Sequence, residues 1–284
     1  MKWQEYIHQH AASLHPLFEI SEANFILKSI AEHIQQVSYS EAKDISVSKA
    51  YLMKAGALIS QVKEGKPLQY VLEEAWFYKY PFKVNASVLI PRPETEELVE
   101  WVISYIDKER DPQYAPEMLD IGTGSGCIPI TLKKERPAVQ VSAIDISQQA
   151  LATARENAVV HNVKIELIAL DFLDERSWAD LKKYDIIISN PPYIPINELE
   201  TLAVNVRNYE PHLALFVPEK KPLLFYEKIA AFGKTHLKKN GVIFLELHKD
   251  FAQETKHLFE QKGYREVIIR KDISGNERML RVQL

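Results

Sequence analysis

Cysteine is nearly absent from this sequence, whose 284 residues include only one, Cys127. A single cysteine excludes an internal disulfide and a zinc site built on cysteines, and we expect no metal in the functional site. Long hydrophobic runs are missing as well, since none approaches the roughly 18–20 residues of a membrane span. The segment Met1–Glu5 lacks the apolar core of a secretory signal, so we expect a cytoplasmic protein with no membrane partner.

The sequence also lacks an excess of basic charge, because 39 acidic residues outnumber 35 basic ones and the net charge is −4. We therefore expect no direct nucleic-acid substrate, although a local basic patch remains compatible with this balance. Internal repeats and low-complexity tracts are absent. A hydrophobic content of 46% is normal for a globular core, and the length allows one large domain or two ordinary ones.

Residues 1–66 show the hydrophobic spacing of helices, which predicts a small N-terminal helical-bundle domain. Ser21 is the expected N-cap of the second helix, and the third pattern, which starts near Ser40, can split into two helices. Two roles are open for this domain, a stabilising cap or a substrate-recognition module, and we adopt substrate recognition as the working assignment. The three stripes contain Leu14, Leu17 and Phe18; then Ala23, Ile26, Leu27, Ile30, Ala31 and Ile34; then Val47, Tyr51, Leu52, Ala55, Leu58, Ile59 and Val62.

Residues 67–90 change character and predict a β-hairpin linker between two domains. Trp76–Tyr78 and Phe82–Val84 are aromatic and β-branched, and a short Lys-Tyr-Pro segment separates them. Pro93 then lies where a proline favours the first turn of a helix, and acidic residues follow it. Those acids are ordinary first-turn charges in one interpretation; in the other, Arg92, fixed between two prolines, points into an active site.

Residues 91–284 alternate strand and helix patterns, which predicts an α/β domain with a doubly wound, mostly parallel sheet. Ser147 is the expected N-cap of the helix after the second strand. The last two strands leave no room for a helix between them, so they must form an antiparallel hairpin. The predicted strands are residues 118–121, 139–145, 165–170, 184–190, 241–247, 264–270 and 279–284.

The stretch Tyr184–Tyr193 reads as a buried strand that stops at Asn190. Pro191 and Pro192 have no N–H to donate, so the chain must leave the sheet there. Ligands bind at the carboxyl ends of strands in such sheets. Asn190 thus offers an amide, Pro191 an unpaired carbonyl and Tyr193 a ring at the rim of a candidate site.

The first predicted strand runs into a glycine-rich turn, Gly122-Thr123-Gly124-Ser125-Gly126, and a helix follows. Glycines permit a tight turn and a close approach of a ligand, which is also how dinucleotide enzymes hold a pyrophosphate. Asp145, at the end of the next strand, can accept hydrogen bonds from both hydroxyls of a ribose. Together they favour an adenosine-containing cofactor over the alternative of an ordinary strand-end aspartate beside a turn.

The third predicted strand ends at Asp171-Phe172. An aromatic ring at that position can lie on a purine, and Asp171 could accept from the adenine amino group. Taken alone, Phe172 is as well explained as a core residue. The functional interpretation gains from the fact that three consecutive strand ends are directed at one nucleoside.

Together these residues resemble a known family. The segment from Asp120 to Ile128 is similar to the S-adenosylmethionine loop of Rossmann-like methyltransferases, and Asn190–Tyr193 resembles the Asn/Asp-Pro-Pro-Tyr motif of enzymes that methylate planar nitrogens. Ile90–Glu96 narrows the resemblance to the HemK/PrmC family, the release-factor glutamine methyltransferases. It covers nearly the whole chain, and further family-like residues are Arg207, Tyr209, Glu210, Pro211, Gly275 and Arg278.

The resemblance implies a role for each candidate residue and a release factor as the protein substrate. Separately, we expect the protein to be a monomer. The substrate glutamine amide would be held by Asn190 and Pro191, the predicted catalytic residues, in a slot shaped by Pro192 and Tyr193. S-adenosyl-L-methionine, which becomes S-adenosyl-L-homocysteine, would be bound by Gly122, Thr123, Gly124, Ser125, Gly126, Asp145, Phe172 and Asn190.

The sequence departs from the family pattern at two places. Glu73-Glu74 stands where a glycine is usual, and Glu246-Leu247-His248 replaces a usual Glu-x-Gly, which leaves the local backbone geometry open. Three other functions remain as alternatives: a glutamine methyltransferase of a ribosomal protein, an adenine or cytosine N-methyltransferase of DNA or RNA, and a non-enzymatic nucleotide-binding module. The last leaves Asn190–Tyr193 unexplained.

Overall fold

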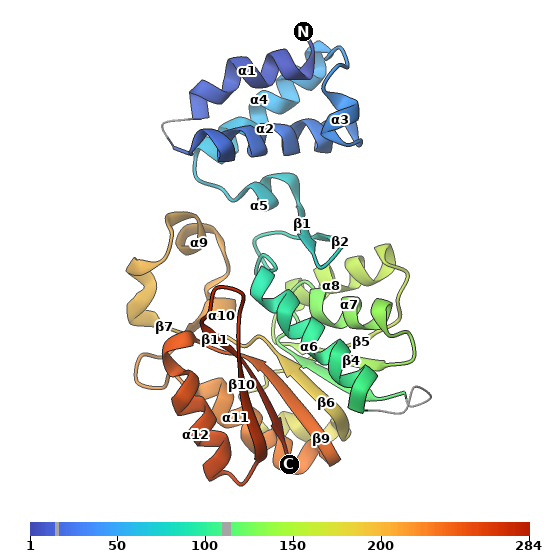
Figure 1. Cartoon of the computed structure of the whole chain (residues 1–284), viewed down its shortest axis with the longest axis vertical. Coiled ribbons are helices and arrows are strands. Elements are labelled where there is room, and N and C mark those ends of the chain that lie inside the picture. Colours follow the sequence, from blue (N-terminus) through green and yellow to red (C-terminus); the bar gives the residue numbers. More distant parts are fainter. Residues whose placement is uncertain (15–16, 110–114) are drawn as a thin grey trace. The chain divides into compact units, whose positions relative to one another are not determined.

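The computed structural model describes residues 1–14, 17–109 and 115–284, which form two compact units (Figure 1). The first unit comprises Met1–Glu74 and Ala203–Tyr209, and it is helical. The second comprises Ala75–Leu202 and Glu210–Leu284, and it contains a central sheet. A segment from the C-terminal half of the chain therefore contributes to the helical unit.

The helical unit buries its apolar faces in a core of its own, which includes Trp3, Leu27 and Ile30. The Tyr209 hydroxyl donates to the Glu64 carbonyl oxygen at 2.9 Å and fastens the late helix to the end of α4. The predicted helical bundle is thus confirmed as an architecture, while its boundary at residue 66 stays a prediction. Its helices are α1 (Trp3–Leu14), α2 (Ile20–Gln35), α3 (Tyr39–Ala42), α4 (Lys49–Lys63), α5 (Leu68–Leu72) and α9 (Val204–Tyr209).

Two details of the predicted bundle are wrong. Helix α2 begins at Ile20 with Glu19 as its N-cap, so Ser21 is already inside the helix. The reason is that the Glu19 carbonyl oxygen accepts from the Ala23 N–H at 2.8 Å, which starts the helix two residues early. Leu17 follows the end of α1 in a turn and is 57% exposed, so it does not extend the first apolar stripe.

Glu73 shows what the missing glycine requires of the backbone. It follows α5 in a left-handed conformation (φ 57°, ψ 23°), and its N–H donates to the Gln69 carbonyl oxygen. Glycine adopts this conformation at little cost, whereas other residues are disfavoured by about 1–2 kcal/mol. After it, β1 (Glu74–Phe77) pairs with β2 (Tyr80–Lys83), and Phe77 and Phe82 enter the core of the second unit.

A seven-stranded sheet in the order β10-β11-β9-β6-β3-β4-β5 forms the centre of the second unit. Strand β11 runs antiparallel to both β9 and β10, while the other neighbouring pairs are parallel. The predicted mostly parallel sheet with a C-terminal antiparallel hairpin is confirmed. The strands are β3 (Glu117–Ile121), β4 (Gln140–Asp145), β5 (Glu166–Ala169), β6 (Tyr184–Ser189), β9 (Leu237–Glu246), β10 (Arg265–Lys271) and β11 (Glu277–Gln283).

Helices cover both faces of this sheet, which makes the unit doubly wound (Figure 1). Side chains alternate across the buried strand β6, so that Ile186 and Ile188 face one core and Ile187 faces the other. On the first face lie α6 (Pro93–Glu109), α7 (Cys127–Glu135) and α8 (Gln148–Val160); on the second lie α11 (Leu224–His236) and α12 (Ala252–Gln261). Ser147 caps α8 as predicted, because its hydroxyl accepts from the Ala150 N–H.

The strand order reverses around β3, which lies between β4 and β6. At such a switch point the connections leave in opposite directions, and a crevice opens outside the carboxyl ends of the strands. The chain after β6 returns to this crevice through elements that the sequence analysis left unassigned. These are β7 (Ile194–Pro195), η2 (Ile196–Thr201), α10 (His212–Leu215) and β8 (Phe216–Val217).

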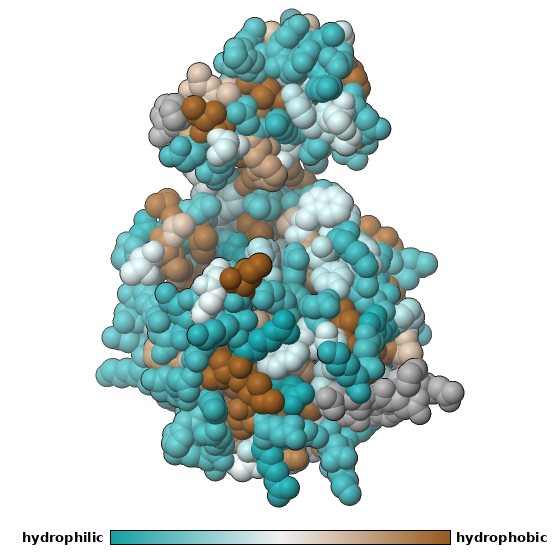
Figure 2. Space-filling view, in the orientation of Figure 1, coloured by the Kyte–Doolittle hydropathy of each residue, from teal (hydrophilic) through white to brown (hydrophobic). Residues whose placement is uncertain are grey.

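The surface shown in Figure 2 is mainly hydrophilic on both units, and the exposed hydrophobic side chains lie in small separate groups. None of the helices in the described ranges is long and apolar enough to cross a membrane.

Candidate active site

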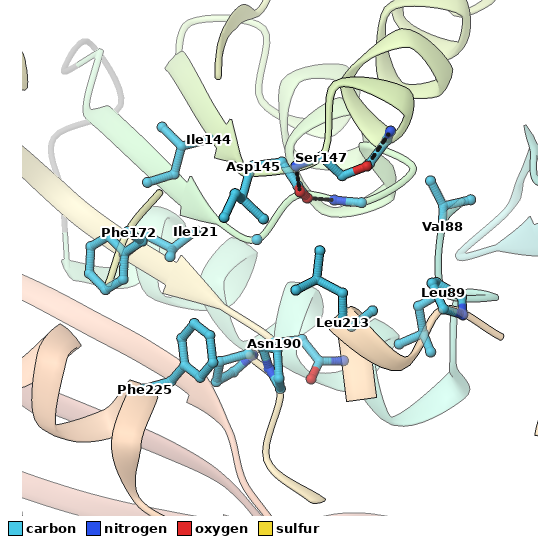
Figure 3. A pocket seen from close by; sticks show the side chains of 18 of the residues that line it. Val88, Leu89, Ile121, Ile144, Asp145, Ser147, Phe172, Asn190, Leu213 and Phe225 are labelled. Carbon is cyan, nitrogen blue, oxygen red and sulfur yellow. Dashed lines mark hydrogen bonds between the residues drawn. The ribbon is translucent and has the colours of Figure 1, made fainter. Parts of the chain in front are cut away.

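A cavity lies at the carboxyl ends of β3, β4, β5 and β6, within the second unit (Figure 3). Its wall is mostly apolar, with a small number of polar groups contributed by strand ends. The lining includes Val88, Leu89, Ile121, Gly122, Gly124, Ile144, Asp145, Ser147, Asp171, Phe172, Asn190, Pro191, Pro192, Leu213 and Phe225. Apolar cavities with a few convergent polar groups are the usual form of a cofactor site.

The glycine turn after β3 uses its glycines in two ways. Gly122 and Gly124 have positive φ angles of 76° and 55°, and a Cβ built on either would meet nothing within 4 Å. Both line the cavity, so their backbone is open to a ligand. At Gly126 (φ 78°) an added Cβ would meet Ile130 Cδ1 at 3.0 Å and Ala154 Cβ at 3.1 Å, so this glycine allows α7 and α8 to pack closely.

Asn157 on α8 holds the glycine turn from behind, and the sequence analysis did not identify it. Its Nδ2 donates to the carbonyl oxygens of Ser125 and Lys83, both at 2.9 Å, and its Oδ1 accepts from the Lys83 N–H at 2.7 Å. The residue is buried. A lone asparagine in a helix carries no sequence signal for such a role, because its partners lie on other elements.

Asp145 lies on the cavity wall, as its position at the strand end predicts. Oδ2 accepts from the Gly124 N–H at 2.8 Å and Oδ1 accepts from the Ser147 N–H at 2.9 Å, so the carboxylate is held between two loops. Burial raises the pKa of Asp145, and these backbone hydrogen bonds oppose that shift. Each oxygen keeps a further acceptor position, which suits a pair of ribose hydroxyls.

Asp120 is a second carboxylate near the glycine turn; its sequence places it in the first predicted strand and in the segment that resembles the S-adenosylmethionine loop, without a role of its own. It is fully buried, and no described residue forms a hydrogen bond of good geometry with either oxygen. Burial raises the pKa of Asp120 to about 7, while the neighbouring Thr123 hydroxyl lowers it and the Asp145 charge raises it further. The buried hydroxyls of Thr123 and Ser125 also lack partners among the described residues.

Phe172 contributes to the cavity wall and to the core at once. Its ring stacks on Trp178 with centroids 5.4 Å apart and meets Phe232 edge to face at 5.4 Å. Both interpretations of this residue therefore remain, and its contact with adenine stays a prediction. Phe225 from α11 lines the same cavity (Figure 3), although nothing in its sequence context singles it out.

Asn190 is fixed by a chain of hydrogen bonds that crosses three elements. Its Nδ2 donates to Thr95 Oγ1 at 3.0 Å, and the Thr95 hydroxyl donates to Glu246 Oε2 at 2.6 Å. The Tyr193 hydroxyl donates to the other oxygen of Glu246 at 3.1 Å. Neither Asn190 Oδ1 nor the Pro191 carbonyl oxygen accepts a hydrogen bond from the described residues.

The Asn-Pro-Pro-Tyr segment divides between cavity and core. Asn190, Pro191 and Pro192 line the cavity, whereas Tyr193 lies behind them with its ring against that of His248, at 5.8 Å between centroids. Burial raises the pKa of Tyr193 well above its ordinary value, so it remains a hydroxyl donor at neutral pH. His248 has a φ of −66°, and the departure from glycine there causes no backbone strain.

Arg92 is held away from the cavity by an ion pair. Its Nη2 lies 2.6 Å from Glu210 Oε1, and the other Glu210 oxygen accepts from the Ile90 N–H at 3.3 Å. Glu210 is buried, so the pair links the segment before α6 to the segment that leads to Leu213. Both segments supply cavity residues, and Arg92 thus supports the wall instead of lining it.

Comparison with known proteins gives consistent matches. A family model, the methyltransferase small domain, matches residues 102–206. The release factor glutamine methyltransferase of Flavobacterium psychrophilum is 41% identical and covers 96% of this chain and 95% of its own. That of Lactococcus lactis subsp. lactis is 36% identical over 100% of both chains. Among solved structures, the human methyltransferase 10 domain containing protein has a TM-score of 0.51 at 18% identity, covering 71% of this chain and 87% of its own, and shows the fold alone.

The two bacterial relatives match across the helical unit, the strand pair and the α/β unit alike, so the similarity is not limited to a common cofactor fold. They confirm the resemblance carried by the glycine turn and the Asn-Pro-Pro-Tyr segment. This chain belongs to the release factor glutamine methyltransferase family.

Proposed function

We propose that this protein transfers a methyl group from S-adenosyl-L-methionine to the side-chain amide nitrogen (N5) of the glutamine in the Gly-Gly-Gln motif of peptide chain release factors, and so modulates translation termination. The observation that carries the proposal is the pair of neighbouring acceptors, Asn190 Oδ1 and the Pro191 carbonyl oxygen, at one end of a nucleoside-sized cavity. An incoming NH₂ group needs two such acceptors to fix its plane.

The residues at the other end fit the proposed cofactor. Gly122 and Gly124 leave open space where a Cβ would stand, and Asp145 offers acceptor positions for ribose hydroxyls. Asp120 is a buried carboxylate that receives no hydrogen bond of good geometry from the described residues, and a cation bound at the glycine turn would stabilise its ionised form. S-adenosyl-L-methionine carries two positive groups, an ammonium and a sulfonium, and supplies an electrophilic methyl group.

Orientation is the main contribution that these residues make to the chemistry. The nitrogen of a glutamine amide is a weak nucleophile, because its lone pair is delocalised into the carbonyl group. Asn190 and Pro191 hold the amide plane so that the nitrogen meets the methyl carbon in line, and such positioning can supply ~7 kcal/mol or more. A carbon–nitrogen bond forms, the carbon–sulfur bond breaks with its electron pair on sulfur, and the amide nitrogen loses one proton to water.

The same acceptors explain selectivity for glutamine over glutamate. A carboxylate has no hydrogen to offer, so it would leave both acceptors unpaired and would face two oxygen lone pairs. Sites built to pair polar groups can discriminate by about 10⁴-fold. We further propose that the helical unit recognises the release factor, that the enzyme is a monomer, and that it acts in the cytoplasm on a protein rather than on nucleic acid.

Transfer of a labelled methyl group tests this function directly. Purified protein is incubated with methyl-labelled S-adenosyl-L-methionine and, separately, a bacterial release factor, a ribosomal protein fraction and DNA. We expect label on the release factor, and none when the glutamine of its Gly-Gly-Gln motif is changed to glutamate. Label confined to the ribosomal fraction or to DNA would reject the proposed substrate.

A further inference from the structure

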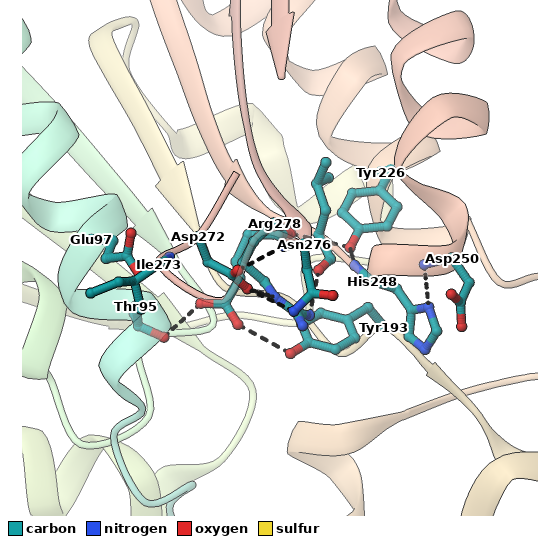
Figure 4. Close-up of polar contacts among 12 residues, drawn as sticks. Thr95, Glu97, Tyr193, Tyr226, His248, Asp250, Asp272, Ile273, Asn276 and Arg278 are labelled. Carbon is teal, nitrogen blue, oxygen red and sulfur yellow. Dashed lines mark hydrogen bonds and ion pairs between the residues drawn. The ribbon is translucent and has the colours of Figure 1, made fainter. Parts of the chain in front are cut away.

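A buried polar cluster, in which Figure 4 labels Thr95, Tyr193 and Arg278, is joined to Asn190 by the hydrogen bond between Asn190 and Thr95. Thr95 lies in the first turn of α6, and Glu246 ends β9; both are buried within the second unit. Neither residue lines the cavity, but Thr95 accepts a hydrogen bond from Asn190, and Glu246 is linked to Asn190 through Thr95. Their position suggests that they act on the substrate through Asn190.

The direction of each hydrogen bond in this cluster can be worked out from Glu246. An ionised carboxylate only accepts, so the hydroxyls of Thr95 and Tyr193 must both donate to it. The Thr95 hydroxyl has one hydrogen, which Glu246 takes, so towards Asn190 its oxygen can only accept. Asn190 must therefore present its NH₂ group to Thr95 and turn its carbonyl oxygen the other way.

We propose that Thr95 and Glu246 are positioning residues that hold the Asn190 carboxamide with its oxygen facing the substrate, and that this fixed direction makes the site select glutamine over glutamate. The inference rests on the proposed function, since it concerns the part of the same site, around Asn190 and Pro191, that would bind the substrate amide. With the opposite direction, Asn190 would present an NH₂ group to the cavity. It would then repel the substrate amide and bind a carboxylate.

The geometry around Glu246 is that of an accepting carboxylate, because each oxygen lies within hydrogen-bond distance of one hydroxyl. Burial, with a smaller contribution from the charge of Glu94, raises the pKa of Glu246, and the hydrogen bonds from Thr95 and Tyr193 and the positive charge of Arg278 limit that rise. Arg278 is held in place because its Nη1 donates to the Leu247 carbonyl oxygen at 3.0 Å and its Nε lies 3.3 Å from Asp272 Oδ2 (Figure 4). The C-terminal hairpin thus supplies a fixed cation to the cluster.

The decisive variant is Thr95→Val, which keeps the shape of the side chain and removes its hydroxyl. Thr95→Ser restores a hydroxyl and serves as the rescue variant. Thr131→Val is the matched control, because Thr131 is a buried helical threonine whose hydroxyl has no partner among the described residues. Steady-state methylation of the release factor is measured for all three, together with inhibition by the same factor carrying glutamate in place of the target glutamine.

For Thr95→Val we expect kcat to fall about 30-fold, because Asn190 no longer holds one orientation. We also expect inhibition by the glutamate form to strengthen about tenfold, as an NH₂ group becomes available to the carboxylate. Thr95→Ser should recover most of both properties, and Thr131→Val should match the wild type. A loss of packing alone would lower stability without changing the preference between the glutamine and glutamate forms.

Nuclear magnetic resonance provides a readout that does not depend on the substrate. The side-chain NH₂ of Asn190, assigned by its disappearance in Asn190→Asp, should exchange slowly with solvent in the wild type and about tenfold faster or more in Thr95→Val. If Thr95→Val left the exchange rate or the preference for glutamine unchanged, the proposal that Thr95 and Glu246 orient Asn190 would be wrong. Failure of the wild type to methylate the release factor would instead reject the proposed function. The exchange experiment would still test whether Thr95 and Glu246 orient the Asn190 side chain.

Discussion

A buried carboxylate lies close to each end of the cavity, Asp120 near the glycine turn and Glu246 near Asn190. The two carboxylates differ in the hydrogen bonds that they receive from the protein. Asp120, under the glycine turn, has no hydrogen-bond donor of good geometry among the described residues. Glu246, behind Asn190, receives one hydrogen bond on each oxygen and lies near the charge of Arg278. At the end of the cavity near Asn190, which we call the acceptor end, the protein itself supplies the hydrogen bonds to the buried carboxylate. At the end near the glycine turn, which we call the donor end, the Asp120 carboxylate could still interact with a cation.

Under the proposed function, this difference matches the separate task of each end. An amide must be met by groups already fixed in direction, because a rotated Asn190 would repel it. A cationic cofactor can instead supply the missing partner when it binds, and the cost of keeping Asp120 unpaired is recovered at that moment. In the proposed reaction, preorganisation is thus concentrated at the end that would bind the weak nucleophile.

The largest expected effect is at Asn190. In Asn190→Ala the substrate amide loses a side-chain acceptor that is held in one direction, so we expect kcat to fall about 10³-fold, or about 4 kcal/mol. Single-turnover methylation at saturating cofactor measures this step. Full activity in this variant would show that the acceptor end does not depend on preorganised side chains, and the comparison between the two ends would fail.

The opposite treatment of the two carboxylates predicts opposite changes in stability. The pKa of Asp120 is about 7 in the folded protein and about 4 when unfolded, so its contribution to stability is present below pH 4 and is lost as the pH rises through 7. Asp120→Asn should therefore leave the cofactor-free protein unchanged below pH 4 and stabilise it by up to about 4 kcal/mol above pH 7. Denaturant unfolding at several pH values measures this.

Glu246→Gln is the matched variant for that experiment. An amide can accept from only one of the two hydroxyls and removes a negative charge near Arg278, which keeps its ion pair with Asp272, so we expect destabilisation by about 2 kcal/mol at pH 7. If both variants changed stability in the same direction, the two carboxylates would not differ in the way that their hydrogen bonds indicate.

The sequence alone was sufficient to predict those features of the site that depend on residues adjacent in the chain. The glycine turn, Asp145 and the Asn-Pro-Pro-Tyr segment were found because strand ends and turn formers are local signals, and the structure places members of each on one cavity. Thr95 was not found, because a helix-start pattern fully accounts for a threonine there. Its partner Asn190 is 95 positions away, and only the assembled sheet brings the two side chains together.

Local sequence patterns also have limits in the helical unit, where two details were predicted wrongly, and after β6, where no elements were predicted. Ser21 is a good cap residue by type, but the chain had already turned at Glu19, which a propensity cannot decide. The chain between Pro195 and Val217 has short elements, whose hydrophobic pattern is too brief to show a period. Leu213 and its neighbours nevertheless form part of the cavity wall.

A smaller effect is expected at Asp145, on the donor side. In Asp145→Asn the charge-assisted hydrogen bonds that we propose for the cofactor ribose would become neutral, so we expect the Kd of S-adenosyl-L-methionine to rise about 30-fold, or about 2 kcal/mol. At saturating cofactor kcat should stay within about threefold of the wild type, because the acceptor end is intact. Calorimetric titration and kinetics separate these quantities. A fall confined to kcat would contradict the division of the cavity into two ends.

The smallest effect concerns strain that belongs to neither end of the cavity. Glu73 has a positive φ and an exposed side chain, so its backbone is strained and its side chain offers no burial in return. Glu73→Gly should raise the free energy of unfolding of the helical unit by about 1 kcal/mol and leave kcat and the cofactor Kd unchanged. Glu74→Gly is the neighbouring control, because residue 74 begins a strand, where glycine weakens the structure. A gain in stability from both variants would point to the loss of acidic charge instead of the relief of backbone strain.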